Sequence, residues 1–262
     1  MKKLLILGCG WVGEEFAHLQ LKNNWQVWAT STNEEKYHRL KADGIFAYIH
    51  DFDQDTEINE VDLPAFDAVL CSIPATHKNS LEQLEARFNR VKAYLEKVNY
   101  AKLIFLSSIG IFPDEDGVFD EGFKDAERMS PKLKLAEDIM GLLPNSYIFR
   151  LAGLFGKQRI FAKYFQGRVC TTGDQPANFV HLDDVCQLLS LSLEQDLAES
   201  VYHVVAPEHP LKRDVILASA KKYQLDLPAA FDPQDSIQKV VDGDRLPRIF
   251  NYRFKYPSPL EF

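Results

Sequence analysis

Three glycines near the start of the chain are spaced to bind a diphosphate. Gly8, Gly10 and Gly13 follow the apolar run 4–7, and a helical pattern continues from about residues 14–22. In such a turn, the first glycine closes a tight bend, the second lets phosphates approach the backbone, and the third lets helix and strand pack closely. The start of the helix adds unpaired N–H groups, which favour an anion. The pattern predicts a dinucleotide-binding turn, because an ordinary strand-to-helix turn explains one glycine well and three poorly.

Strand and helix patterns alternate through the first two-thirds of the chain. The predicted strands are residues 4–7, 26–30, 45–49, 66–72, 103–106 and 146–151, and the predicted helices are 14–22, 33–42, 79–98 and 130–143. Each β-α crossover places a helix on one face of a parallel sheet, so this order indicates an α/β fold, a doubly wound parallel-sheet Rossmann fold. Ligands of such sheets lie at the carboxyl ends of the strands. The residues predicted there to bind the cofactor are Gly8, Cys9, Gly10, Trp11, Val12, Gly13, Ser31, Thr32, Asp51, Phe52, Ser72, Ile73 and Pro74.

The last third of the chain is less regular. We predict that residues 1–156 form the dinucleotide-binding domain and that residues 178–206 complete its sheet. Residues 157–177 and 207–262 are predicted to form a small C-terminal lobe that binds the substrate.

The bulk composition narrows the classes of function. The chain has 262 residues, 46% of them hydrophobic, and a formal net charge of -8, which argues against a nucleic-acid or anionic-membrane partner. The four cysteines are scattered and the histidines form no ligand pattern, so we expect neither disulfides nor a metal site. The short apolar start lacks a cleavage site, and no apolar stretch is long enough to span a membrane. We therefore expect a cytoplasmic protein with a small-molecule substrate.

The chain resembles the extended and atypical short-chain dehydrogenase/reductases, which form the NAD-dependent epimerase/dehydratase family. The resemblance spans nearly the whole chain. It is carried by the turn at 8–13 and by four further runs, which are residues 106–112, 134–137, 150–156 and 178–185. The tail at 250–258 is similar to the end of the atypical subgroup.

The resemblance assigns the catalytic positions and reveals a substitution among them. Family enzymes use a serine or threonine, a tyrosine and a lysine, the last two spaced Y-x-x-x-K. The serine falls on Ser108 and the lysine on Lys134, which would also hold the ribose beside the nicotinamide. The tyrosine position is Ser130, and the turn after the serine strand has Phe112 where a tyrosine is usual. A serine hydroxyl is a far poorer acid than a phenol, and loss of a general acid typically costs about 10²–10⁴-fold in rate.

Three functions therefore remain open. The first is an NAD(P)-dependent oxidoreductase or epimerase/dehydratase acting on a sugar-like or other small carbonyl substrate, with its proton from water or from Tyr164 or His181. The second is a non-catalytic dinucleotide-binding sensor or scaffold. The third is a structural relative with a degraded pocket.

The end of the second strand favours NADP over NAD as cofactor. Ser31 and Thr32 stand where an acidic residue would bind the ribose 2′-hydroxyl of NAD. Hydroxyls can donate to a 2′-phosphate, and Lys36 or Arg39 lies one helical turn further on. The acidic residues 34–35 argue for NAD.

Two further predictions concern partners. Arg159 and Arg168 would suit an anionic substrate, although arginines in an irregular stretch are more often surface charges. Family members often dimerise through the helix pair that corresponds to residues 79–98 and 130–143, so the resemblance implies a homodimer.

Overall fold

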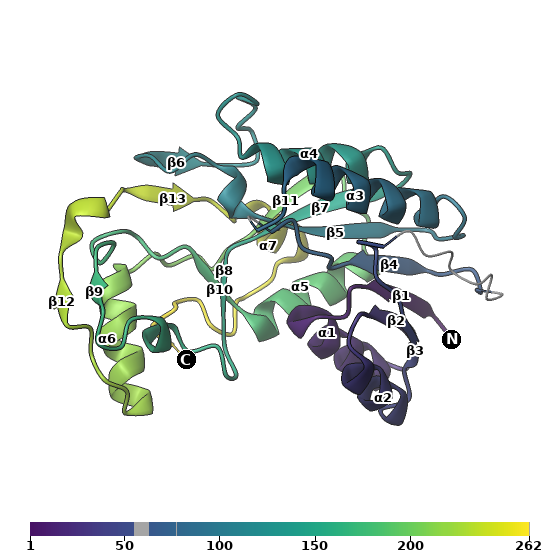
Figure 1. Cartoon of the computed structure of the whole chain (residues 1–262), viewed down its shortest axis with the longest axis horizontal. Coiled ribbons are helices and arrows are strands. Elements are labelled where there is room, and N and C mark those ends of the chain that lie inside the picture. Colours follow the sequence, from purple (N-terminus) through teal and green to yellow (C-terminus); the bar gives the residue numbers. More distant parts are fainter. Residues whose placement is uncertain (55–62, 77, 262) are drawn as a thin grey trace. The chain divides into compact units, whose positions relative to one another are not determined.

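A seven-stranded sheet forms the centre of the computed structural model, which describes residues 1–54, 63–76 and 78–261 (Figure 1). Its strand order is β11-β7-β5-β4-β1-β2-β3. The strands are β1 Lys3–Leu7, β2 Gln26–Ser31, β3 Phe46–Ile49, β4 Ala68–Cys71, β5 Leu103–Ser108, β7 Ser146–Leu151 and β11 Val201–Val204. The pairs β1–β2, β1–β4, β2–β3 and β4–β5 are parallel. The predicted α/β doubly wound fold is therefore confirmed.

Four helices cover this sheet, and their ends follow from local chemistry. They are α1 Trp11–Lys22, α2 Glu34–Ala42, α3 Leu81–Leu95 and α4 Pro131–Gly141. Helices α1 and α2 lie on one face and α3 and α4 on the other (Figure 1). Asn33 caps α2 by accepting a hydrogen bond from the Lys36 N–H, and Ser80 and Gln83 form a reciprocal capping box at α3. Helix α1 begins three residues earlier than predicted, within the glycine turn itself.

The chain divides into two compact units. The first unit contains residues 1–111, 129–149 and 192–201, and the second contains residues 112–128, 150–191 and 202–262. The main apolar core of the first unit packs β1, β4 and β5 against α3 and α4, with Phe88, Phe105 and Met140 fully buried.

The second unit is built from three two-stranded parallel sheets and three helices. The strand pairs are β6 Gly117–Phe119 with β13 Lys239–Val241, β8 Gly153–Phe155 with β10 Phe179–His181, and β9 Val169–Cys170 with β12 Ala230–Phe231. The helices are α5 Leu182–Glu194, α6 Lys212–Tyr223 and α7 Arg245–Phe250. Its short 3-10 turns are η2 Phe161–Tyr164 and η3 Pro233–Asp235, whereas η1 Ile109–Ile111 follows β5 in the first unit.

These units differ from the division predicted at residue 156. Residues 112–128 belong to the second unit because β6 pairs with β13, more than 100 residues away in the sequence. Of the segment 178–206, β11 joins the seven-stranded sheet, whereas β10 pairs with β8 outside it. The role of residues 157–177 and 207–262 in binding a substrate stays a prediction.

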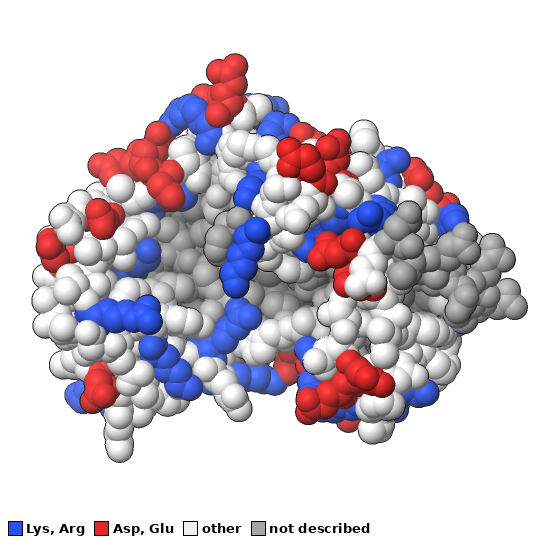
Figure 2. Space-filling model, in the orientation of Figure 1, with Lys and Arg blue, Asp and Glu red and all other residues white. Residues whose placement is uncertain are grey.

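Surface and thiol features complete the description. The face drawn in Figure 2 carries both acidic and basic side chains, so it is not a continuous basic surface. All four cysteines are buried free thiols. Among residues 1–54, 63–76 and 78–261, no helix is both long and apolar enough to cross a membrane, and no three His, Cys, Asp or Glu side chains are grouped to hold a metal ion.

Candidate functional site

The glycine turn after β1 has a backbone that only glycine adopts easily. Gly8 has φ +73°, and a Cβ there would lie 2.8 Å from the Ile73 side chain. The Gly8 N–H donates to the Thr30 hydroxyl at 2.9 Å, and the Cys9 N–H donates to the Thr30 carbonyl at 2.8 Å. The first glycine therefore closes a turn that β2 holds in place.

The second and third glycines have different surroundings. Gly10 is the N-cap of α1 and has no side chain to satisfy the first helical N–H groups. Among the described residues, and apart from its chain neighbours and the backbone of its own helix, a Cβ on Gly10 would meet only the Gly8 carbonyl within 4 Å, at 3.8 Å, so the space beside it is open. A Cβ on Gly13 would lie 3.1 Å from the Ile6 side chain, which shows how closely α1 packs on β1. An open second position and a crowded third one fit a pyrophosphate at the helix start.

The other side chains of the turn serve packing. Cys9 and Val12 are buried, and Trp11 is partly buried. Burial raises the pKa of the Cys9 thiol to about 12, so this thiol stays protonated at neutral pH. Cys9, Trp11 and Val12 would therefore contribute to a cofactor site through their backbone atoms.

A pair of cations lies beside this turn. Lys36 Nζ donates to the Cys9 carbonyl at 3.2 Å and lies 3.1 Å from a Glu14 carboxylate oxygen. Arg39 contacts the other oxygen of Glu14 at 2.7 Å. Burial acts to raise the pKa of Glu14, but hydrogen bonds from Lys36 and Arg39 outweigh it and hold that pKa below its ordinary value. Lys36 and Arg39 thus share the Glu14 carboxylate beside the glycine turn, and Glu35 and Asp43 also lie within electrostatic range of Arg39.

The end of β2 is organised by its own hydroxyl. The Ser31 hydroxyl accepts a hydrogen bond from the Asn33 N–H at 3.1 Å, and Ser31 is buried. Thr32 is exposed. Of these two predicted cofactor residues, Thr32 is thus the one with its side chain accessible.

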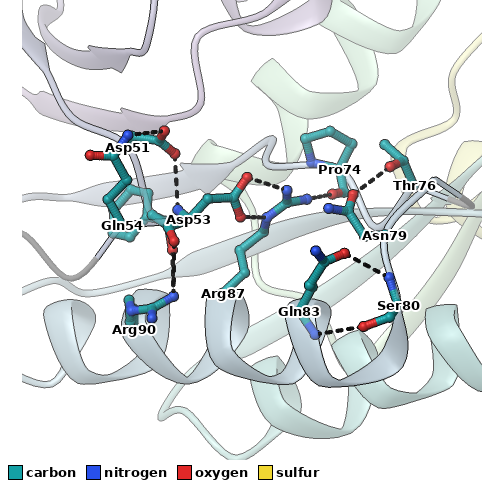
Figure 3. A network of polar contacts seen from close by, with 11 residues as sticks. Asp51, Asp53, Gln54, Pro74, Thr76, Asn79, Ser80, Gln83, Arg87 and Arg90 are labelled. Carbon is teal, nitrogen blue, oxygen red and sulfur yellow. Dashed lines mark hydrogen bonds and ion pairs between the residues drawn. The ribbon is translucent and has the colours of Figure 1, made fainter.

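The loops after β3 and β4 are joined by a polar network (Figure 3). Asp51 accepts a hydrogen bond from the Asp53 N–H at 2.9 Å, as in an ordinary strand-end turn, and Phe52 is buried against Tyr94. The Ser72 N–H donates to the Leu7 carbonyl at 2.8 Å. The predicted residues of these loops therefore lie at the same sheet edge as the glycine turn.

The backbone of Ile73 also lies against that turn. Its Cα and N would be 3.2 Å from a Cβ on Gly8. Ile73 is buried, whereas Pro74 is exposed. Together with the Ser72 hydrogen bond, this packing fixes the loop after β4 relative to the end of β1.

The predicted catalytic residues lie at the end of β5 and at the start of α4. Ser108 is the last residue of β5, and its hydroxyl accepts from the Gly110 N–H at 3.1 Å. Ser130 is the N-cap of α4, with no side-chain capping bond. Lys134 Nζ donates to both carboxylate oxygens of Asp138, at 2.8 and 2.6 Å. Lys134 is therefore held by its own helix.

A second carboxylate approaches the same strand end from α4. The Ser107 hydroxyl donates to Glu137 Oε1 at 2.6 Å, and both residues are buried. Leu133, one helical turn before Glu137, has a methyl group 3.7 Å from where a Cβ of Gly110 would lie. The face of α4 that contacts the end of β5 thus presents Leu133 and Glu137, and Lys134 is on the next row.

The further candidates belong to the second unit. His181 Nδ1 accepts a hydrogen bond from the Asp183 N–H at 3.0 Å, and its ring lies 3.8 Å from the Tyr256 ring centroid. Burial lowers the pKa of His181, so the ring is neutral at pH 7, and the other ring nitrogen carries its proton. Tyr164, Arg159 and Arg168 are exposed. Their roles as proton donor or anion-binding residues stay predictions.

The sheet, its strand order and the glycine turn define a class of protein: the chain has the fold of the NAD-dependent epimerases and dehydratases. The resemblance inferred from the motifs is confirmed at the level of the fold. No family model matches the chain. It is 28% identical to Protein YeeZ of Escherichia coli (strain K12) over 270 residues, which cover 99% of this chain and 98% of that protein.

Solved structures with this fold cover almost the whole chain. One is a conserved protein of unknown function from Silicibacter pomeroyi, with TM-score 0.78, 24% identity, and coverage of 99% of this chain and 96% of that one. Another is UDP-glucuronic acid 4-epimerase from Bacillus cereus in complex with UDP-glucuronic acid and NAD. Its TM-score is 0.73 at 15% identity, and the match covers 98% of this chain and 95% of that one.

Two residues that organise the candidate site are absent from the sequence-based prediction. They are Arg87 and Asp53, which are joined by hydrogen bonds. Thr30, which holds the glycine turn through its hydroxyl, is the last residue of the predicted strand 26–30. A signal for Arg87 exists, because it is a charged residue on the apolar face of α3, between Leu84 and Phe88. No local pattern identifies its partner, which lies 34 residues earlier.

Proposed function

We propose that this chain binds NADP or NAD at the glycine turn and acts as an oxidoreductase or epimerase/dehydratase on a sugar-like or other small carbonyl substrate. The observation that carries the proposal is the open space beside Gly10 at the start of α1, between crowded positions at Gly8 and Gly13. Solved proteins of the same fold hold NAD, and one also holds UDP-glucuronic acid. The nicotinamide would accept or supply the hydride.

The residues of this chain would then orient the substrate. The Ser108 hydroxyl, at the carboxyl end of β5, would donate a hydrogen bond to the substrate carbonyl. Lys134 would bind the ribose after leaving Asp138, and the cost is small because an exposed i,i+4 ion pair is worth about 0.3–0.5 kcal/mol. With serine at position 130, the proton would come from water or another side chain.

Replacing Ser108 with alanine tests the catalytic proposal. We expect the wild type to consume NADPH or NADH with at least one member of a panel of carbonyl compounds and nucleotide sugars. S108A should lower kcat/KM by about 10²-fold, because one hydrogen-bond donor to the developing oxyanion is lost. Its affinity for the coenzyme, measured by calorimetry, should be unchanged. Turnover by S108A at the wild-type rate would remove Ser108 from the mechanism.

The alternative is a non-catalytic protein that senses or scaffolds a dinucleotide. Two observations favour it: Lys134 is paired with Asp138, and Ser130 stands in the tyrosine position. Tight coenzyme binding by the wild type, without coenzyme consumption across the whole panel, would select this alternative.

We propose NADP as the preferred coenzyme, because Lys36 brings a positive charge to the glycine turn from the start of α2. The wild type should bind NADPH more tightly than NADH. Lys36→Gln should reduce that preference about tenfold, since a charge-assisted bond to the 2′-phosphate is lost. The matched control is Lys41→Gln on the same helix, because the Lys41 ammonium contacts Tyr37 instead. Equal affinity of the wild type for both coenzymes would contradict the preference.

A further inference from the structure

Arg87 is a charged side chain buried on the apolar face of α3. The residue is 8% exposed and lies in the row formed by Leu84, Phe88 and Val91. A buried cation is stable only when its N–H groups are paired. Each guanidinium nitrogen of Arg87 donates a hydrogen bond: Nε and Nη2 reach the two carboxylate oxygens of Asp53, both at 2.6 Å, and Nη1 reaches the Pro74 carbonyl at 2.8 Å (Figure 3).

These partners come from loops that follow different strands. Asp53 lies after β3 and Pro74 after β4, and the sheet order separates those strands by β2 and β1. Neighbouring strands are about 4.8 Å apart, so β3 and β4 are roughly 14 Å apart. By bonding to both Asp53 and Pro74, Arg87 links the loop after β3 to the loop after β4 at the carboxyl ends of these strands. Arg90 adds weaker bonds to the carbonyls of Phe52 and Asp53, at 3.3 and 3.4 Å.

The loop after β4 in turn contacts the glycine turn. The Ile73 backbone lies 3.2 Å from where a Cβ of Gly8 would be, and the Ser72 N–H bonds to the Leu7 carbonyl. Arg87 is therefore connected through Pro74 and Ile73 to the turn proposed to hold the pyrophosphate. Through Asp53 it is also connected to the loop at 51–54.

We infer that Arg87 and Asp53 form a positioning pair that sets the spacing between the glycine turn and the loop after β3, around the adenosine half of the dinucleotide. The inference rests on the proposed function. Arg87 touches no ligand in this role; it acts through Pro74 and Asp53. The hydrogen bonds from Arg87 also hold the pKa of Asp53 below its ordinary value, so the pair stays charged at neutral pH.

The test uses ADP-ribose, which has the adenosine and the diphosphate but no nicotinamide. Arg87→Lys keeps the charge and loses the two-point contact with Asp53, because an ammonium cannot match the planar guanidinium. Calorimetry should show about tenfold weaker binding of ADP-ribose to R87K. Asp53→Asn, at an accessible carboxylate, should weaken binding in the same direction. The double variant should be no weaker than R87K, since both changes remove one contact.

Gln83→Ala is the matched control, since it removes half of the capping box of the same helix, and the Gln83 side chain bonds to the Ser80 N–H rather than to Asp53 or Pro74. Melting temperatures of all variants are compared. Weaker ADP-ribose binding in R87K but not in Q83A, at a similar melting temperature, would support the inference. Equally weakened ADP-ribose binding in Q83A, or wild-type affinity in R87K and D53N, would overturn this inference and leave the proposed function standing. A wild type without affinity for ADP-ribose would overturn the proposed function and the inference with it.

Discussion

Replacing Gly10 with valine is expected to abolish dinucleotide binding and to leave the protein folded. Gly10 has φ -80° and ψ -150°, a backbone of extended type whose negative φ does not exclude a residue with a Cβ. In the part of the chain that the structure describes, the nearest atom that a Cβ here would meet outside its chain neighbours is the Gly8 carbonyl oxygen, at 3.8 Å. The valine side chain would fill the space into which the phosphates must move. We expect the affinity for NADPH to fall by at least about 100-fold, which corresponds to ~2.7 kcal/mol.

The stability of G10V should change little, because two small effects oppose each other. Valine is a poorer N-cap than glycine, which costs about 0.5–1 kcal/mol, and replacing glycine restricts the unfolded chain, which stabilises by a similar amount. Thermal unfolding should therefore place G10V within about 1 kcal/mol of the wild type.

Gly8→Ala provides the contrast within the same turn. Gly8 has φ +73°, and its Cβ would lie 2.8 Å from Ile73, so alanine is strained and crowded there. G8A should bind the dinucleotide more weakly and should also melt at a lower temperature. G10V should show the loss of affinity with little change in melting temperature. Wild-type affinity in G10V would show that the dinucleotide binds elsewhere.

The parts of the fold that local patterns encode were predictable from the sequence. The apolar run before Gly8 and the spacing of the glycines predicted β1, the turn and α1, because backbone conformation and strand packing constrain those residues directly. The start of the predicted helix 33–42 is another local feature, because Asn33 caps α2 by accepting a hydrogen bond from the Lys36 N–H. The pairing of Lys134 with Asp138 is an i,i+4 contact and could also have been expected.

Contacts between distant segments were not predictable in this way. Residues 112–128 join the second unit through β6 and β13, a pairing that no short pattern of either strand specifies. Asn178 shows the same limit. Its side chain accepts from the Val241 N–H and donates to the Lys239 carbonyl, both at 2.8 Å, so it acts as a strand clamp. No local pattern around Asn178 identifies these partners, which lie more than 60 residues later in the chain.

Asp184 is expected to be the most sensitive position for the stability of the second unit. It is fully buried at the start of α5, and its carboxylate accepts hydrogen bonds from the Tyr252 hydroxyl at 2.6 Å and from the backbone N–H groups of Lys255 and Tyr256 at 2.7 and 3.1 Å. Burial and this hydrogen bond raise the pKa of Tyr252, so its phenol remains a donor at neutral pH. One carboxylate thus fastens the C-terminal segment to α5.

Asp184→Ala should therefore destabilise the protein by about 3–5 kcal/mol, because three donors lose a charged acceptor inside the protein. Differential scanning calorimetry should show a fall in Tm of roughly 10 °C. Tyr252→Phe removes one of the three bonds and should cost about 1.5–3 kcal/mol.

The neighbouring Asp183→Ala is the control for D184A. Asp183 forms an exposed ion pair with Lys255 at 2.9 Å, and such pairs contribute less than about 1 kcal/mol. Both substitutions remove one negative charge from the first turn of α5, so their effect on the helix dipole is the same. The difference in Tm between D184A and D183A therefore measures the buried contacts of Asp184 less the smaller contribution of the Asp183–Lys255 ion pair. If D184A and D183A had the same Tm, the Asp184 carboxylate would not be the group that holds residues 252–256 in place.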